Sequence, residues 1–203
     1  MKPASDQLTF DPQMHLYRLN DVPIPSVTQI MQPLSRHKYG DIDEEILNRA
    51  AERGTAVHTA IEFYDRYGLD ECEGEARPYF EAYLNWQRKF KPQVIANEQT
   101  TWHKNLLYAG TVDMLADVMG KLTLIDFKTT ATLNDMLTTV QLEAYRRALD
   151  TQDPYHPIMQ TAILQLKQDG TYTWKTYKVP DLEAWQTFTA LITVRAHIIK
   201  YGG

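Results

Sequence analysis

The stretch Lys121-Leu122-Thr123-Leu124-Ile125-Asp126-Phe127-Lys128-Thr129 decides the fold class of this chain. Side chains alternate between the two faces of a β-strand, and both faces of this stretch begin with mainly apolar residues. That pattern is typical of a strand in the centre of a sheet that is covered on both sides. Its end, however, places Asp126 and Lys128 on one face, and buried charges are unfavourable unless they are paired or bound to a metal ion. The stretch therefore predicts a buried central strand that ends in either a structural ion pair or a functional site.

The preceding predicted strand, residues 108–118, contains the same kind of exception. Residues 108–116 are apolar or small except for Asp113. If the two strands pair as a hairpin around Gly120, Asp113 lies close to Asp126. Two neighbouring carboxylates repel each other and raise each other's pKa, and a divalent cation between them removes that conflict. An oxygen-rich site of this kind suits Mg²⁺ or Mn²⁺.

A lysine beside such a pair of acids has a clear role in phosphodiester hydrolysis. Lys128 can position the attacking water or stabilise the charge that develops on phosphorus. Taken alone, the Asp126-Phe127-Lys128 triplet is explained better by an ion pair at a strand end, because short motifs occur by chance. It is the only acid-x-Lys triplet in the chain, and the acid on the preceding strand favours a site.

The remaining pattern predicts helices before and after these strands. Gly54 lies inside one long predicted helix, where glycine costs about 1 kcal/mol relative to alanine, so we expect close packing or a ligand to explain it. The resulting fold class is α/β, or mixed α+β, with a central mixed β-sheet flanked by helices. The expected elements are a strand pair within 8–19, an extended segment 22–25, a helix from Val27 capped by Ser26, helices 44–67 and 77–90, strands 94–102, 108–118 and 121–129, a helix from 134 or 135 to 149, a hairpin of 158–167 and 171–179, and a helix 182–200.

Length and composition are those of one globular domain. The chain has 203 residues, with 43% hydrophobic and 23% charged residues, which we interpret as a single domain over 1–203. Within it, 1–92 is mainly helical, 93–180 is the sheet core with an inserted helix, and 181–203 is a C-terminal helix. No apolar run is long enough to span a membrane, and the N-terminus lacks the apolar segment of a secretory signal. A lone cysteine, Cys72, indicates a reducing compartment, and we expect a cytoplasmic protein.

Net charge decides nothing about nucleic acid. The chain carries a formal charge of −5, which is unusual for a DNA-binding protein. Residues 62–81 hold seven acidic and two basic side chains, so this segment alone accounts for the whole excess. Carboxylates that gather around a metal ion also make a protein look acidic until the ion binds.

Four short motifs resemble those of the PD-(D/E)XK nuclease superfamily, specifically its RecB-type exonuclease branch. Each motif is weak alone, but their joint order over 54–145 is fairly specific. The segment Ile24-Pro25-Ser26-Val27-Thr28 also resembles the beginning of phage-encoded members. The four motifs are Gly54-Thr55-Ala56-Val57-His58 on a helix, Gly110-Thr111-Val112-Asp113 and Asp126-Phe127-Lys128 on strands, and Gln141-Leu142-Glu143-Ala144-Tyr145 on a helix.

The resemblance implies a restriction-endonuclease-like core and DNA as the substrate, usually cut from an end. It also implies that the ligands of the metal ion are His58, Asp113, Asp126 and the backbone carbonyl of Phe127, with Lys128 catalytic. An imidazole ligand favours Mn²⁺ over Mg²⁺. Some relatives hold an iron–sulfur cluster on four cysteines, and with one cysteine we expect no such cluster here.

Several further residues have two interpretations each. Glu62 lies one helical turn from His58 and is expected to be a further metal ligand or to hold that histidine in place. Glu98 either joins the acidic cluster or faces solvent from an edge strand. Gln141 and Tyr145 share a helix face and either orient the lysine and contact DNA, or are a surface amide and a partly buried tyrosine. Other candidates are Arg146 and Arg147 for phosphate, Arg36, His37, Lys38, Arg49 and Arg53 for the DNA backbone, and Trp86, Trp102, Trp174 and Trp185 for the core.

Together these features predict a metal-dependent DNA nuclease, an exonuclease rather than an endonuclease, encoded by a bacterium or a phage. Recombination, repair or phage DNA processing is the expected process. The resemblance leaves room for an oligomer and for a recombination or single-strand-annealing partner protein. The alternative from another class is a catalytically weak module that binds DNA ends or assists assembly. A sequence-specific endonuclease is a third interpretation, disfavoured because 203 residues leave no room for an extra recognition domain.

Overall fold

Five strands form the central sheet of the computed structural model, which describes residues 6–40 and 43–202 apart from the side chain of Tyr39. The strand order is β4-β5-β6-β7-β8. Every neighbouring pair is antiparallel except β6 and β7, which are parallel, so the sheet is mixed, as the sequence predicts. The strands are β4 (Gln93–Trp102), β5 (Ala109–Val118), β6 (Lys121–Lys128), β7 (Gln160–Leu166) and β8 (Tyr172–Tyr177).

The hairpin of β5 and β6 turns at Gly120, as predicted. Gly120 has a φ of 80°, a left-handed conformation that glycine adopts without a steric penalty. The two strands pair in a register that places Met114 opposite Ile125 and Leu115 opposite Leu124. Because β6 lies in the centre of the sheet, its side chains Leu124 and Ile125 are buried in separate cores on the two faces.

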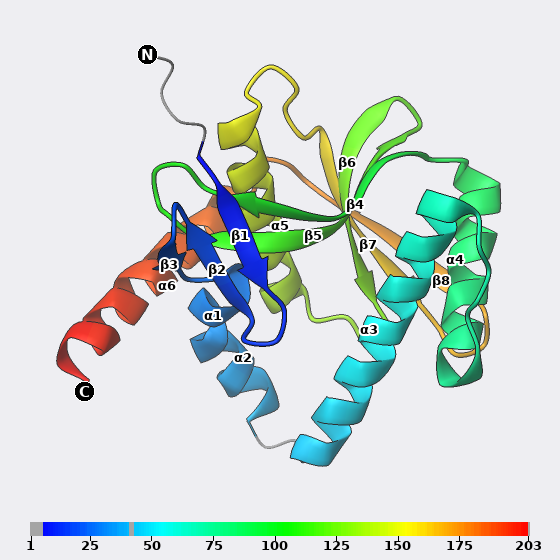
Figure 1. The fold of residues 1–203 in the computed structure, drawn as a ribbon, viewed down its shortest axis with the longest axis horizontal. Coiled ribbons are helices and arrows are strands. Elements are labelled where there is room, and N and C mark those ends of the chain that lie inside the picture. The colour runs from blue at the N-terminus through cyan, green and yellow to red at the C-terminus, as the bar shows by residue number, and fades with distance from the viewer. Residues whose placement is uncertain (1–5, 41–42, 203) are drawn as a thin grey trace.

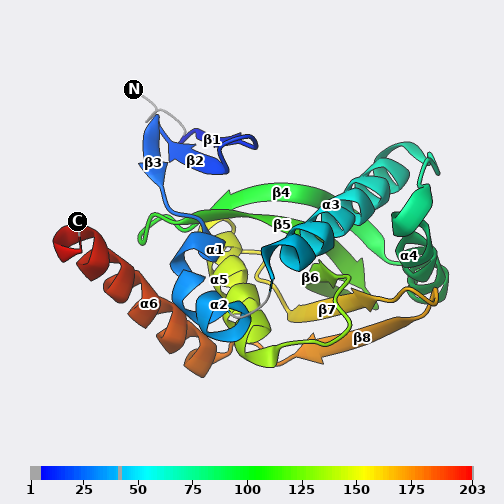
Figure 2. The same cartoon turned by 90° about the horizontal axis from the view of Figure 1, so that it is seen from below.

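Helices cover both faces of the sheet (Figures 1 and 2). The chain passes from β6 to the parallel strand β7 through α5 (Asp135–Gln152), which packs on one face with α1 (Val27–Ile30) and α6 (Leu182–Tyr201). The other face is covered by α3 (Glu44–Tyr67) and α4 (Arg77–Phe90), joined through the short helix η1 (Gly74–Ala76). The helix α2 (Gln32–Tyr39) connects α1 to α3.

A small N-terminal sheet packs beside β4 and β5. Its strands β1 (Leu8–Asp11), β2 (Leu16–Leu19) and β3 (Val22–Ile24) are antiparallel, so the segment predicted to be extended is a third strand. Two contacts join this sheet to β5: Ala109 N–H donates to the carbonyl of Pro25 at 2.9 Å, and the hydroxyls of Tyr17 and Thr111 lie 2.8 Å apart. The N-terminal sheet is therefore fixed next to the strand that carries Asp113.

Local capping sets the helix starts, and the sequence predicts these positions well. The side chains of Asp43, Asn134 and Asp181 each accept a backbone N–H in the first turn of their helix, and Ser26 forms a capping box with Gln29. Such caps satisfy N–H groups that have no partner within the helix. Within the described ranges, no helix is long and apolar enough to cross a bilayer.

A partly buried carboxylate ties α3 to its neighbours. Asp65 accepts hydrogen bonds from the Tyr83 hydroxyl at 2.6 Å, from Gln87 at 3.1 Å and from Asn97 at 2.7 Å. Desolvation raises the pKa of Asp65, and the bonds from Tyr83 and Asn97 oppose that rise. Because Asn97 precedes Glu98 on β4, this network holds α3 in register with the part of β4 that faces it.

Candidate active site

The ends of β5 and β6 bring the two predicted aspartates together. The Asp113 Oδ2 atom accepts the backbone N–H of Phe127 at 2.7 Å, so the Asp113 side chain reaches across to β6 beside Asp126. Burial raises the pKa of Asp126 to about 6; the Lys128 amine opposes this rise and the Asp113 charge adds to it. The predicted juxtaposition of two acids on neighbouring central strands is therefore present.

Three side chains from three different elements converge at this point. His58 comes from α3, Glu98 from β4 and Asp113 from β5, and one ligand atom of each lies within 4.8 Å of the others. His58 Nδ1 is 3.2 Å from Glu98 Oε1 and 3.6 Å from Asp113 Oδ1. One imidazole nitrogen and two carboxylate oxygens form a donor set that suits Mn²⁺ or Mg²⁺.

The protonation of His58 shows that this cluster attracts positive charge. Burial alone would lower the pKa of His58, but the carboxylates of Asp113 and Glu98 outweigh that effect and raise it to about 9. Without a bound cation, the imidazole therefore carries a proton between two acids at neutral pH. A divalent cation would replace that proton, so the three residues fit a metal ion both in donor type and in charge.

Lys128 pairs with Asp126 beside this cluster. Its amine is 2.5 Å from Asp126 Oδ2 and donates to Gln141 Oε1 at 3.3 Å. The Asp126 carboxylate is buried, whereas the Lys128 side chain is 28% exposed and can be reached from solvent. The alternation predicted for β6 thus places the acid and the amine of the triplet on one face, next to α5.

The Gly110 and Gln141–Tyr145 positions of two quoted motifs have a packing reason. Gln141 and Tyr145 lie one turn apart on α5, and the Tyr145 hydroxyl bonds to the Gln141 side chain. The ring of Tyr145 rests on Gly110 so closely that a Cβ atom at this position would overlap the ring. Gly110 therefore lets α5 approach β5, and this approach brings Gln141 to the lysine amine.

The structure bears on two expectations about α3, of which the ligand role of Glu62 stays a prediction. Glu62, proposed as a ligand, is bound to Arg66 at 2.8 Å and lies outside the group of converging ligands found among the described residues. Glu98 takes that place, because β4 adopts a left-handed backbone at Glu98, with φ of 48°, and turns its carboxylate to His58. Close packing does not explain Gly54, since an added Cβ would meet only Thr129 Oγ1 at an ordinary 3.8 Å.

Glu98 is the functional candidate that sequence reasoning undervalued. Its position in the polar triplet Asn97-Glu98-Gln99, inside a strand, was the available signal. Asn97 pairs with Met114 and Gln99 pairs with Val112. Glu98, which lies between them, is therefore beside Asp113. Pairing register is a tertiary property, and the sequence left two interpretations of this glutamate open.

The two arginines after Tyr145 do not both face solvent. Arg146 is buried and bonds Glu143 at 2.6 Å, and it also pairs with Asp150. Arg147 donates to the same Glu143 at 2.9 Å. Phosphate binding by Arg146 was therefore a wrong expectation, because a buried guanidinium with two carboxylate partners is not available to a ligand. Trp86 is fully buried, and Trp102, Trp174 and Trp185 pack against the cores, as predicted.

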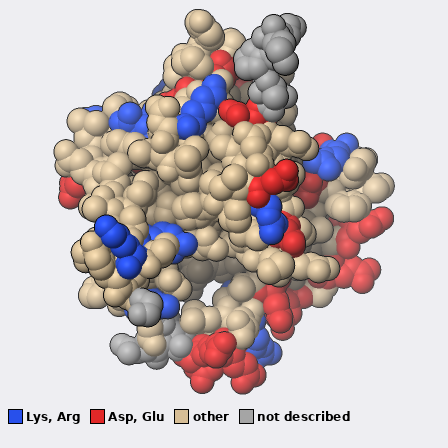
Figure 3. Space-filling view, turned by 60° about the vertical axis from the view of Figure 1, so that its left-hand side comes forward, with Lys and Arg blue, Asp and Glu red and all other residues tan. Residues whose placement is uncertain are grey.

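Two grooves open from the site at different positions along α3, one beside its middle turns and the other beside its first turns. The first, called here the hairpin groove, has a volume of about 500 Å³ and lies between the β1–β2 hairpin, α3 and β4; it contains His58 and Glu98. The second, the lysine groove, has a volume of about 400 Å³ and lies between α2, α3 and α5; it contains Lys128 and Gln141. One face of the molecule shows a hollow in its lower part, with basic side chains to its left and acidic ones to its right and below (Figure 3).

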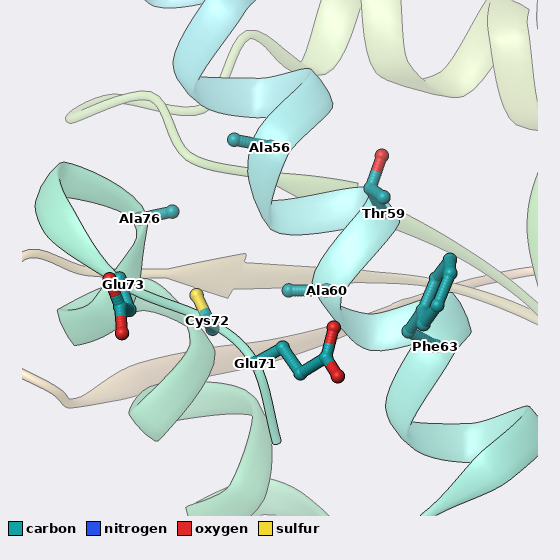
Figure 4. A pocket seen from close by; sticks show the side chains of 8 residues that line it. All are labelled: Ala56, Thr59, Ala60, Phe63, Glu71, Cys72, Glu73 and Ala76. Carbon is teal, nitrogen blue, oxygen red and sulfur yellow. The ribbon is translucent and has the colours of Figure 1, made fainter. Parts of the chain in front are cut away.

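A third cavity, on the far side of α3, lacks the residues of the site. It measures about 370 Å³ and is lined by Cys72, Glu71 and Glu73 together with small residues of α3. The two glutamate side chains lie on either side of Cys72 and do not converge (Figure 4). This cavity is therefore not a second candidate active site.

Several solved structures share the general arrangement at low similarity. An alkaline exonuclease from Laribacter hongkongensis is 11% identical, with 71% of this chain and 80% of that chain covered and a TM-score of 0.46. SSO0001 is 12% identical, with 86% and 74% covered and a TM-score of 0.45. The same Laribacter exonuclease in complex with dAMP is 11% identical, with 87% and 88% covered and a TM-score of 0.42. No curated protein matches significantly.

The family comparison is decisive. The model of the PD-(D/E)XK nuclease superfamily matches residues 75–197, which is more than half of the 203 residues. The matched segment includes Glu98, both aspartates and Lys128, whereas His58 precedes it. The chain belongs to the PD-(D/E)XK nuclease superfamily.

Proposed function

We propose that this nuclease hydrolyses DNA phosphodiester bonds with one or two Mg²⁺ or Mn²⁺ ions and that it cuts from a DNA end. The observation that carries the proposal is the convergence of His58, Glu98 and Asp113 within 4.8 Å, beside the Asp126–Lys128 ion pair. Acids in this number, with a lysine next to them, are unfavourable in a structural role because each buried charge must be desolvated.

The ligand set that we propose is His58, Glu98, Asp113 and Asp126, with the backbone carbonyl of Phe127 kept from the family resemblance. When bound, a divalent cation supplies a Lewis acid that offsets negative charge on the phosphate and makes water more acidic. The protein residues fix where that chemistry happens. Asp113 is held by the Phe127 N–H, and β5 and β6 are central strands, so these two carboxylates move little.

Lys128 is the proposed catalytic amine. It is held between Asp126 and Gln141, so the amine has a defined position in the wall of the lysine groove. There it can orient an attacking water or stabilise the negative charge that develops on phosphorus. Gln141 and Tyr145 position this amine, because Gln141 accepts a hydrogen bond from it and the Tyr145 hydroxyl bonds to the Gln141 side chain.

The test is a time course of product length on end-labelled linear DNA with Mn²⁺. We expect Lys128→Ala and Asp126→Asn each to lose at least about 100-fold in rate, the usual effect of removing one preorganised charge-stabilising group, while circular dichroism shows an intact fold. A covalently closed circle should stay uncut if cleavage starts at ends. Full metal-dependent activity of Lys128→Ala would refute the assigned role. Recombination, repair or phage DNA processing, and a single-strand-annealing partner, stay predictions from the resemblance.

A further inference from the structure

The hairpin groove carries aromatic rings directly beside the proposed cation ligands. Phe10, His15 and Tyr17 of the β1–β2 hairpin line the same groove as His58 and Glu98. The hairpin is fixed relative to them, because the Tyr17 hydroxyl bonds Thr111, two residues before Asp113 on β5. Any group that rests on these rings therefore lies at a defined position relative to the cluster of ligands.

The rings are arranged so that two of them remain accessible. Tyr17 is only 2% exposed and stacks on Phe10 with ring centres 4.4 Å apart. Phe10 is partly exposed and His15 is exposed, with the histidine ring edge-on to Phe10 at 5.6 Å. His15 also has a φ of 47°, a left-handed conformation that non-glycine residues seldom adopt without a functional or structural constraint.

The other walls of this groove suit a neutral group better than a phosphate backbone. Among the residues that the structure describes, no lysine or arginine lines the groove, whereas Glu62 and Glu98 do. Binding to the backbone of a duplex depends on neutralising phosphates with basic side chains. A nucleobase instead needs an aromatic face for stacking and hydroxyl groups for hydrogen bonds. Hydroxyls are supplied by Thr55, Thr59, Thr100 and Thr111.

We propose that Phe10 and His15 stack an unpaired nucleobase next to the scissile phosphate, so that the substrate is DNA with a single-stranded end. Inside a duplex a paired base cannot offer its face to a ring, because its neighbours cover both sides, and at a blunt end only the outermost pair has one face free. The inference rests on the proposed nuclease function and names the class of DNA that this function acts on.

The test compares two oligonucleotides of equal length and charge, one of them oligothymidylate and the other carrying abasic sites in place of the bases. Binding is measured by fluorescence anisotropy in EDTA, so that no cleavage occurs. We expect the native protein to prefer the oligothymidylate by about 5- to 100-fold, the range for stacking of a base on an aromatic side chain. Phe10→Leu and His15→Asn should each reduce that preference, and the double variant should abolish it with little change in abasic binding.

Two control variants and the choice of asparagine at position 15 keep the test sharp. Met14→Ala lies on the same hairpin, is 71% exposed and does not line the groove, so it should keep the native preference. Phe10→Tyr retains a ring and should also keep it. Asparagine tolerates the left-handed backbone at position 15, so His15→Asn tests the ring even if a change at Phe10 loosens the hairpin.

Either of two results would overturn the inference while leaving the nuclease function in place. One is equal binding of both oligonucleotides by an enzyme that cuts DNA, and the other is an unchanged preference in the double variant. Cleavage of a blunt duplex as fast as cleavage of single strands would also overturn the inference. A protein that neither cuts nor binds DNA would instead overturn the proposed function, and the inference with it.

Discussion

The two grooves that meet at α3 present different chemistry to a ligand. The hairpin groove carries the acids, the histidine and the aromatic rings. The lysine groove carries Lys128 and Gln141, and an adjoining cavity that shares part of its wall includes His37 and Lys38. The difference teaches that one site has an acidic half beside the middle turns of α3 and a basic half beside its first turns. The net charge of −5 does not reveal this division, because it sums the charges of both halves.

The first prediction separates Glu98 from Glu62, two acids of the hairpin groove. Glu98→Gln should weaken Mn²⁺ binding by at least about 10-fold, since even residues that only support a metal ligand contribute 10- to 100-fold. Glu62→Gln should leave the Kd within about twofold, because Glu62 is paired with Arg66 and exposed pairs contribute little. Isothermal titration with MnCl₂ measures both. If Glu62→Gln weakened Mn²⁺ binding more than Glu98→Gln did, Glu62 would be the metal ligand.

The second prediction concerns pH and the acidic half of the site. A histidine ligand must be neutral to bind a metal ion, and the pKa of His58 without a cation is raised to about 9. Lowering the pH from about 9 towards 6 should therefore weaken Mn²⁺ binding about tenfold per unit, because each unit reduces the neutral fraction tenfold. Below pH 6, protonation of Asp126, whose pKa is raised to about 6, should steepen the loss.

Proton release is the measurement that checks this pH dependence. Titrations in buffers of different ionisation enthalpy should show about one proton released per Mn²⁺ bound at pH 7.5. The variant Glu98→Gln removes one of the acids that hold the proton on His58, so it should release fewer protons. Metal affinity that is flat between pH 6 and 9 would contradict the assignment of His58 as a ligand.

The smallest predicted effect belongs to the basic half. Lys38→Ala should reduce the slope of log affinity against log salt by about 0.9 if this lysine contacts one duplex phosphate, and by about 0.7 for a single strand. Affinity should fall about equally for all sequences, since phosphate contacts carry no base information. Lys200→Ala on α6 is the matched control, because Lys200 is equally exposed and lies outside both grooves. Equal slopes for the two variants would remove Lys38 from the DNA path.

Local chemistry explains which features were predictable. The caps at Asp43 and Asp181 depend on residues within one helical turn, and the alternation of β6 depends on its own side chains. The hairpin at Gly120 also follows from neighbouring residues, and it is what brings Asp113 to Asp126. The pairing of Arg146 with Glu143 had a sequence signal in their three-residue spacing. The burial of Arg146 had no such signal. The interpretation as one domain over 1–203 stays a prediction.

The sequence by itself determined the β5–β6 hairpin, the pair of central acids and the lysine, because strand periodicity and short-range turns depend on adjacent residues. Only the tertiary structure decided that β7 pairs with the other edge of β6 and that Glu98 lies beside His58, since these depend on pairing register and on a left-handed backbone at Glu98. It also decided that Phe10, His15 and Tyr17 share a groove with His58. Contacts between segments so far apart in the chain arise from packing of separate layers, which no local pattern specifies.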